Sequence, residues 1–286
     1  MNLKNFMPES NDPSLELNGF IWKLSNPSIM GILNATPDSF SDGGLYDHPE
    51  RARSQINKMH RDGAQIIDIG AESTRPGSKP ISEAMEISRL HPLLKSLPKD
   101  KYLISIDSNK IQVQESCIKL GAHIINDVFG GSIPLFQLAE EYQVGLVLMH
   151  SSGIPETMQN NTEYTNIMDD ILFWMEEKRK ALSAFSTPVV WYDPGIGFGK
   201  TLEQNLILMS HLDRFKKEGF PVLLGSSRKS WIDKLFGVDV HHRLGASISS
   251  ILYAYQQGCE LFRVHDVFES NQALQTLKVL EKNRNG

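Results

Sequence analysis

Polar side chains that can bind or activate a substrate stand at the end of one apolar run after another along this chain. Carboxylates and amides accept hydrogen bonds from a donor-rich heterocycle, whereas Arg, Lys and His side chains bind phosphate. The set comprises Asn34, Asp68, Glu72 to Arg75, Asp107, Asn126, Asp127, His150, Asp193, Ser226 to Ser230, Arg263, His265 and Asp266. Each residue alone has a second explanation as the cap of a helix or turn. Together they predict one site with a heterocycle on one side and a phosphate leaving group on the other.

The first apolar run, residues 28–33, ends at Asn34 and opens into a loop that is dense in Pro, Gly, Asp and Ser. Four to eight apolar residues followed by turn signals are typical of a strand buried on both faces. The loop through Gly44 carries more hydroxyl and carboxylate groups than a connector needs. A capped surface turn is the alternative. We expect this loop to take part in chemistry.

The elements that position these residues alternate along the chain, as apolar runs and helix-period stretches, which is typical of parallel βα units. The expected strands are 28–33, 65–69, 102–106, 123–126, 144–149, 188–192, 221–225 and 260–264. The expected helices are 50–62, 81–95, 110–120, 133–142, 165–184, 201–217, 243–257 and 268–283. Eight such pairs in roughly 250 residues match a closed barrel, whereas an open doubly wound sheet more often has fewer strands. We therefore predict an α/β fold, a (β/α)8 TIM barrel, as a single domain.

The catalytic face of such a barrel is built from the C-terminal ends of its strands, where the polar residues fall. Residues 28–286 form the predicted barrel domain, and residues 1–27 are an N-terminal extension. The sequence leaves open whether residues 19–24 form a short strand that plugs the bottom of the barrel.

The chain has 286 residues, a formal net charge of -5 and a pI near 6.0. This balance argues against a nucleic-acid-binding surface, although a local phosphate site is compatible with it. Cys117 and Cys259 lack metal-ligand spacing and are interpreted as core thiols in a reducing compartment. The first twenty residues are polar, and no run of about eighteen apolar residues occurs. We expect a cytoplasmic protein that binds neither nucleic acid nor membranes.

The glycine-rich segment 193–201 ends like a nucleotide-binding P-loop, but Pro194 stands where that motif requires its first glycine. Its glycines are also one residue short of the dinucleotide fingerprint. We interpret the segment as a close-approach loop that holds Phe198 over whatever binds there. His241 and His242 lack a third ligand, so they are expected at the solvated surface rather than on a metal.

Five motifs resemble those of the dihydropteroate synthase family, in the same order and at similar spacing over residues 28–283. They are Met30 to Gly44, Asp68 to Gly77, Asp193 to Lys200, Ser227 to Ser230 and Arg263 to Asp266. The resemblance implies a (β/α)8 barrel that is commonly a homodimer. It also implies a transferase that joins 6-hydroxymethyl-7,8-dihydropterin pyrophosphate to p-aminobenzoate with Mg²⁺ present, giving 7,8-dihydropteroate and pyrophosphate.

The resemblance places the pterin deep in the barrel. Asp107, Asn126 and Asp193 would accept hydrogen bonds from its amino-pyrimidinone edge, Lys229 would donate to ring heteroatoms, and Met149 would line the same pocket. If the bond to pyrophosphate breaks before the amine attacks, the pterin becomes a cation. Asp107 and Asp193 would stabilise that charge as it develops.

The first loop and the last strand would serve the leaving group. The resemblance implies that Asn34 binds Mg²⁺ together with pyrophosphate oxygens, while Arg263, His265 and Thr74 bind the anion directly. Magnesium suits such a site because it prefers substrate phosphates plus one or two protein oxygens. Asp42 would close down from the first loop onto the developing pterin cation.

The second substrate is a flat arylamine that carries a carboxylate. Its implied binding residues are Phe40, Thr74, Arg75, Pro76, Phe198 and Ser230. At Ser230, backbone N–H groups at a helix start would meet the carboxylate. No dedicated general base is needed, because an arylamine is already neutral at pH 7. We expect pyrophosphate and magnesium to order the 35–44 and 72–79 loops and so to assemble this pocket.

The sequence departs from the family pattern after two strands. Asp107 is followed by Ser108-Asn109 where Thr-Tyr is usual, and His150 is followed by Ser151-Ser152 where Met-Gln is common. Two other function classes stay open: a pterin-binding methyltransferase that serves corrinoid proteins, and a catalytically silent pterin-binding paralogue. The methyltransferase would not need the Ser39–Gly44 loop or the anion site at Arg263 and His265.

Overall fold

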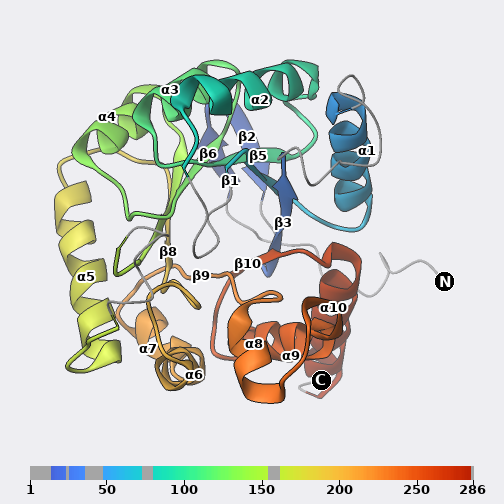
Figure 1. The fold of residues 1–286 in the computed structure, drawn as a ribbon, viewed down its shortest axis with the longest axis vertical. Coiled ribbons are helices and arrows are strands. Elements are labelled where there is room, and N and C mark those ends of the chain that lie inside the picture. The colour runs from blue at the N-terminus through green and yellow to red at the C-terminus, as the bar shows by residue number, and fades with distance from the viewer. Residues whose placement is uncertain (1–13, 24–25, 36–47, 73–79, 154–161, 285–286) are drawn as a thin grey trace.

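The computed structural model describes residues 14–23, 26–35, 48–72, 80–153 and 162–284. Its main sheet has eight parallel strands, around which the helices form an outer ring (Figure 1). Those strands are β3 (Ser28–Asn34), β4 (Ile66–Gly70), β5 (Leu103–Asp107), β6 (Ile124–Asp127), β7 (Gly145–Met149), β8 (Val190–Asp193), β9 (Leu223–Leu224) and β10 (Leu261–Val264).

The strands pair in the order β8-β7-β6-β5-β4-β3-β10-β9. A single parallel bridge between Tyr192 and Val222 joins β8 to β9, and the Tyr192 N–H donates to the Pro221 carbonyl over 2.9 Å. The sheet therefore closes on itself, and the predicted (β/α)8 barrel is confirmed. Each predicted strand is present, with bounds that differ by one or two residues at most ends.

Ten α-helices are described. They are α1 (His48–Arg61), α2 (Glu83–Ser96), α3 (Ile111–Lys119), α4 (Ile133–Tyr142), α5 (Ile167–Leu182), α6 (Leu202–Ser210), α7 (Leu212–Lys217), α8 (Ser230–Phe236), α9 (Leu244–Gln256) and α10 (Val267–Arg284). The single helix expected over 201–217 was wrong, because His211 leaves helical geometry (φ -131, ψ 32) and divides α6 from α7. Helix α8 is absent from the helices expected from periodicity, since its seven residues are too few to show a helical period, but it begins at Ser230, where the family resemblance implied a helix start.

The strands are apolar because the barrel buries both of their faces. In β3, for example, every residue from Ser28 to Leu33 is buried and only Asn34, the last, is partly exposed. One face packs against the surrounding helices. The other points inward, and residues near the N-terminal ends of the strands fill the lower barrel: Met30, Ile66, Leu103, Ile124, Val147, Trp191, Leu223 and Leu261.

An antiparallel hairpin, β1 (Ser14–Leu17) and β2 (Phe20–Lys23), covers this floor. Its two-residue turn has positive φ at Asn18 (46°) and Gly19 (78°), as the Asn-Gly hairpin turn requires. Leu17 is fully buried among the inward-facing residues. The Asn18 amide also donates to the Ala122 carbonyl over 2.8 Å. The open question of residues 19–24 is thereby settled: their strand spans 20–23 and belongs to a hairpin at the barrel floor.

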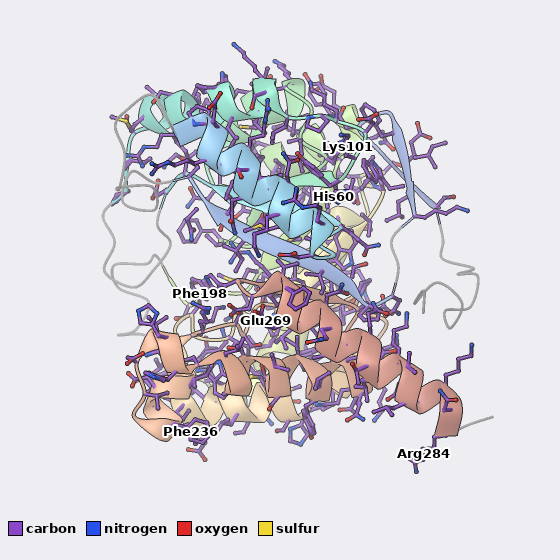
Figure 2. The ribbon with its side chains drawn as sticks, turned by 90° about the vertical axis from the view of Figure 1, so that its right-hand side faces the viewer. His60, Lys101, Phe198, Phe236, Glu269 and Arg284 are labelled. Carbon is purple, nitrogen blue, oxygen red and sulfur yellow. The ribbon has the colours of Figure 1, made fainter. Side chains whose placement is uncertain are left out.

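The two ends of the barrel therefore have different characters. Figure 2 shows Phe198 at one end and the blue hairpin at the opposite end, with α10 running from Glu269 on the Phe198 side to Arg284. At the Phe198 end, β3, β5 and β8 finish with Asn34, Asp107 and Asp193. No helix among the described residues is long and apolar enough to cross a membrane.

Candidate active site

Arg263, on β10, bridges two carboxylates at the mouth of the barrel. Its Nε donates to Asp68 Oδ2 over 2.6 Å, and a terminal guanidinium nitrogen donates to Asp107 Oδ2 over 2.7 Å. Asp68 is fully buried and also accepts from Ser105 Oγ (2.6 Å) and Asn126 Nδ2 (3.0 Å). One buried carboxylate thus fixes the arginine and the asparagine at once.

The Asp107 carboxyl is 6% exposed, and its Oδ1 has no hydrogen-bond partner among the described residues. A buried acceptor without a partner is costly in a folded protein, so it marks a place for a ligand donor. Burial raises the pKa of Asp107 to about 7, the Arg263 guanidinium opposes the rise, and the Asp68 carboxylate adds to it. The group can accept or lose a proton near neutral pH.

Asp193 and Lys229 approach each other across the adjacent part of the mouth. A Cβ at Gly225 would lie 3.3 Å from Asp193 Oδ2 and 3.6 Å from Lys229 Nζ, so glycine gives both groups room. Lys229 donates to the Ile196 carbonyl over 2.6 Å and lies 4.5 Å from the centre of the Phe198 ring. Burial lowers the pKa of Lys229 to about 8, with Asp193 opposing and Arg263 reinforcing the change.

The anion side of the mouth is formed by neighbouring strands. β10, which carries Arg263, pairs with β3, which ends at Asn34. His265 follows β10, and its Nδ1 lies 3.2 Å from Ser227 Oγ. An arginine, a histidine and an amide that converge at strand ends can bind a phosphate group.

Arg228 positions the segment before α8. It has a positive φ of 54°, a conformation that residues with side chains seldom adopt. Its guanidinium pairs with the Asp266 carboxylate through two nitrogens, and its N–H donates to Ser247 Oγ over 2.9 Å. Its charge is thus used within the protein, and its turn directs the following residue, Lys229, into the mouth.

The donor set suits a magnesium ion that is shared with a substrate. Among the described residues, no three His, Cys, Asp or Glu side chains are grouped so as to hold a metal. Asn34 supplies a neutral amide oxygen at the end of β3, close in the sheet to β10. Magnesium prefers one or two protein oxygens plus phosphate oxygens. The residues therefore fit magnesium that binds with a phosphorylated ligand.

Comparison with known proteins places this barrel in a family. The family described as "Pterin binding enzyme" matches residues 30–265. A dihydropteroate synthase of Clostridium beijerinckii is 41% identical over 258 residues, which cover 88% of this chain and 93% of that protein. The chain belongs to the dihydropteroate synthase family.

Solved structures agree with this family assignment. The Xanthomonas albilineans dihydropteroate synthase with 4-aminobenzoic acid superposes with a TM-score of 0.87 at 33% identity, covering 95% of this chain and 99% of that one. The Thermus thermophilus dihydropteroate synthase in complex with 6HMPPP gives a TM-score of 0.79 at 36% identity, covering 94% and 99%. The family resemblance predicted from five motifs is confirmed.

Most of the predicted site residues that the structure describes come together at the mouth. Asp107, Asn126, Asp193, Lys229 and Arg263 have side chains that contact one another or a shared neighbour. Phe198 lies against Lys229.

Three further predicted residues lie at or near the ends of these elements. Met149, 3% exposed, ends β7 and pairs in register with Asp193. Ser230 is exposed and is the first residue of α8. Asn34 ends β3. Their roles toward ligands stay predictions.

Five predicted residues lie outside the part of the chain that the structure describes, in the two loops that follow β3 and β4. These are Phe40, Asp42, Thr74, Arg75 and Pro76. The expectation that pyrophosphate and magnesium order the 35–44 and 72–79 loops concerns the same segments and also stays a prediction.

Sequence reasoning placed Asp68 in the polar set without giving it a role. A role for Asp68 is indicated by its position in the middle of the apolar strand segment 66–70, since a buried charge requires a partner. The structure supplies that partner in Arg263, at the far end of the chain. Asp68 therefore organises the site from beneath rather than facing the mouth as a ligand.

Proposed function

We propose that this chain is the transferase that condenses 6-hydroxymethyl-7,8-dihydropterin pyrophosphate with p-aminobenzoate to give 7,8-dihydropteroate and pyrophosphate. The observation that carries the proposal is the buried Asp107 carboxyl, with one oxygen lacking a partner among the described residues and the other held by Arg263. The Asp107 carboxyl can accept hydrogen bonds from an N–H-rich ring, and the adjacent Arg263 guanidinium can bind an anionic leaving group. Membership of the dihydropteroate synthase family supports the same reaction.

The pterin end of the site stabilises positive charge. The bond between the pterin methylene carbon and the pyrophosphate oxygen breaks, and its electron pair leaves with the oxygen. The carboxylates of Asp107 and Asp193 lie in a buried setting, where they stabilise a developing cation more strongly than they would in water. Lys229 donates to the ring while Asn126, held by Asp68, fixes its orientation.

The anion end receives the leaving group. Arg263 and His265 would bind pyrophosphate oxygens, and Asn34 would hold a magnesium ion through its amide oxygen. When bound, magnesium neutralises part of the negative charge that the leaving oxygen acquires. Thr74 and Asp42, assigned from the family resemblance, would complete this end and close over the pterin.

The arylamine completes the reaction from above the pterin. Its nitrogen lone pair forms the new C–N bond, and the N–H proton passes to water or to the released pyrophosphate. Phe198, held beside Lys229, offers a flat apolar wall to the ring. Phe40, Arg75, Pro76 and Ser230 are proposed as the remaining contacts, with the start of α8 facing the carboxylate. The buried free thiols fit the cytoplasm as the compartment.

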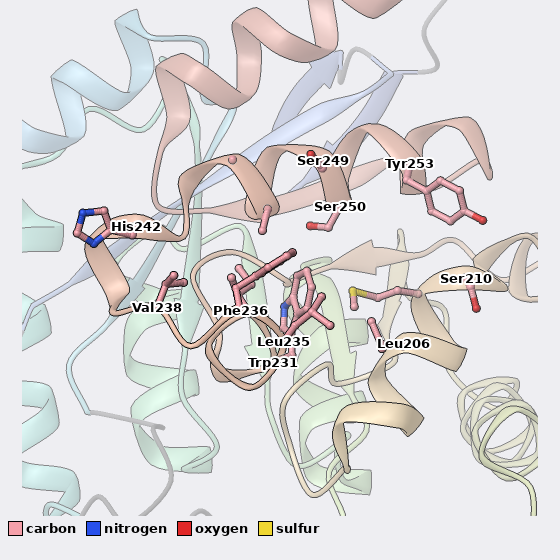
Figure 3. A pocket seen from close by; sticks show the side chains of 14 residues that line it. Leu206, Ser210, Trp231, Leu235, Phe236, Val238, His242, Ser249, Ser250 and Tyr253 are labelled. Carbon is pink, nitrogen blue, oxygen red and sulfur yellow. The ribbon is translucent and has the colours of Figure 1, made fainter.

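The homodimer implied by the family is also part of the proposal. A pocket of 710 Å³ lies between α6, α8 and α9 on the outside of the barrel (Figure 3). Leu235, Phe236 and Tyr253 at its edge are 44%, 61% and 51% exposed. Contiguous exposed apolar side chains support a face that meets a second copy. Light scattering should give twice the chain mass for the wild type. Phe236→Glu introduces a charge on this face and should lower the measured mass. A monomeric wild type would contradict the dimer.

A pyrophosphate-release assay tests the proposed reaction. The purified chain, magnesium and dihydropterin pyrophosphate should release pyrophosphate only when p-aminobenzoate is added, with one 7,8-dihydropteroate formed for each pyrophosphate. Pterin binding without release, with any arylamine, would identify a silent pterin-binding protein. Methyl transfer to a corrinoid acceptor without release would identify a methyltransferase.

A further inference from the structure

Lys200 ends the glycine-rich loop that resembles a nucleotide-binding motif, yet it does not face the mouth. Its side chain is 1% exposed. Its Nζ lies within hydrogen-bond distance of the carbonyl oxygens of Gly195 (3.0 Å), Phe198 (3.0 Å) and His150 (3.4 Å) and of His150 Nδ1 (3.2 Å). An ammonium has three protons, so these acceptors satisfy it fully inside the protein.

The backbone of the glycine-rich loop before Lys200 adopts an unusual path that the hydrogen bonds from Lys200 stabilise. Gly195, Gly197 and Gly199 have φ values of 70°, 83° and 60°, and a Cβ at Gly195 would lie 1.9 Å from the His150 carbonyl oxygen. Glycine permits this path but adds conformational freedom. Carbonyl groups that turn inward would repel one another without a cation between them. Lys200 supplies that cation at the centre of the turn.

Other contacts fix the outer side of the same loop. Asn205 Oδ1 accepts from the Gly197 N–H over 2.7 Å, and Tyr164 donates to the Gly199 carbonyl over 3.2 Å. Thr201 begins α6 with a capping box. These contacts hold the backbone at Gly197 and Gly199, whereas Lys200 holds the carbonyls of Gly195 and Phe198.

Within the described part of the chain, no carboxylate forms an ion pair with Lys200. Burial and the Lys229 ammonium lower the pKa of Lys200 to about 7, against the attraction of Asp193. The same burial, together with Lys200, lowers the pKa of His150 to about 3, so that its ring is neutral and Nδ1 can accept. Burying a charged group is costly unless its hydrogen bonds are satisfied inside the protein, as the acceptors around Lys200 satisfy them.

We propose that Lys200 is a positioning residue that holds Phe198 against Lys229 and thereby shapes the wall on which the arylamine binds. This rests on the proposed synthase function. Lys200 touches no substrate. It acts through the Phe198 carbonyl, and the Phe198 ring in turn lies 4.5 Å from Lys229 Nζ.

A double-mutant cycle with Lys200→Met and Phe198→Ala tests this inference through the two Michaelis constants. Lys200→Met should raise the KM for p-aminobenzoate on the order of tenfold, the size of a lost charged hydrogen bond, and change the KM for dihydropterin pyrophosphate by less than about threefold. In the Phe198→Ala background the same lysine change should add less than about twofold, because its route to the substrate is gone.

Lys178→Met is the matched control, since Lys178 on α5 also donates to a glycine carbonyl, that of Gly131, but outside the mouth. It should leave both KM values unchanged. If Lys200→Met does not fold, Lys200→Gln, which keeps two N–H donors, replaces it in the cycle. The inference would be overturned if the lysine change had equal effects in both backgrounds. It would also be overturned if the KM for p-aminobenzoate stayed unchanged, or if both KM values changed equally. An inactive wild-type chain would instead reject the proposed function.

Discussion

At the mouth of the barrel, Arg263 bridges two buried carboxylates, and the Asp107 carboxyl keeps one oxygen without a partner among the described residues. At the floor, the fully buried His123 accepts from the Ile104 N–H over 3.0 Å and lies at the edges of the Phe20 and Trp22 rings. Both ends bury a titratable group, but at the mouth it is held in direct ion pairs, whereas the direct partners of His123 are a backbone N–H and aromatic rings.

This difference between the two ends of the barrel indicates that the mouth serves catalysis and the floor serves stability. At the mouth, burial raises the pKa of Asp107 to about 7 and lowers that of Lys229 to about 8, and neighbouring charges modify both shifts, so both groups respond to a ligand near neutral pH. At the floor, burial lowers the pKa of His123 to about 4, the nearby Lys99 ammonium adds to the decrease, and the ring stays neutral at pH 7. In a (β/α)8 barrel, chemistry at the C-terminal ends and stability at the N-terminal ends are the expected division. Variants at the two ends should therefore change different quantities.

Lys229→Ala should have the largest effect. Lys229 is proposed to orient the pterin ring, and a ring displaced from its productive position costs about 10²-fold or more in kcat. Steady-state pyrophosphate release measures it, and the melting temperature should change little because the Lys229 ammonium is itself costly to bury. A wild-type kcat in this variant would show that Lys229 does not act in the site.

Leu17→Ala should act on stability alone. Leu17 is fully buried at the floor, and truncating such a side chain costs about 2–5 kcal/mol of unfolding free energy. Ile21→Ala on the same hairpin, 76% exposed, is the matched control and should be close to neutral. Urea unfolding measures both variants. A loss of kcat/KM in folded Leu17→Ala would contradict the assignment of stability to the floor and catalysis to the mouth.

His123 should make the floor sensitive to acid. Its pKa is 6.5 when unfolded and about 4 when folded, so the unfolded chain takes up a proton first as the pH falls. Stability is lost between about pH 6.5 and 4 and amounts to ~3 kcal/mol for this one residue. His123→Asn keeps an acceptor for Ile104 and should lose less stability than the wild type over that range. Parallel pH curves for the two proteins would show that His123 does not titrate in this way.

Asp193→Asn should have the smallest of these effects. It replaces a charged acceptor with a neutral one, which weakens binding of the dihydropterin pyrophosphate by about 10- to 100-fold. Calorimetric titration measures the Kd. The free energy of unfolding should remain near that of the wild type, and an unchanged Kd would place the pterin elsewhere in the mouth.

The sequence predicted the barrel because strands buried on both faces stand out as short apolar runs that alternate with helices. Periodicity did not reveal α8, since seven residues show no period, and only the family resemblance implied a helix start at Ser230. The hairpin turn at Asn18-Gly19 was not predicted, although that dipeptide is a strong hairpin signal. Residue types and their places at strand ends also predicted which groups meet at the mouth.

What the sequence did not reveal is how these groups pair. Arg263 and Asp68 are 195 positions apart, so no local pattern encodes their ion pair. Lys200 occupies the position of a phosphate-binding lysine in a motif-like loop, whereas the folded backbone turns its carbonyls inward onto the ammonium. Such pairings depend on closure of the whole barrel.

The pH dependence of kcat/KM for dihydropterin pyrophosphate tests the central claim most directly, because this quantity reports the ionisable groups of the free enzyme. The carboxylate of Asp107 and the ammonium of Lys229 are the active forms. Activity should therefore rise to a maximum between the pKa values of about 7 and about 8 and fall on either side. A profile that stays flat from about pH 6 to about pH 9 would contradict the assignment of Asp107 and Lys229 to the pterin.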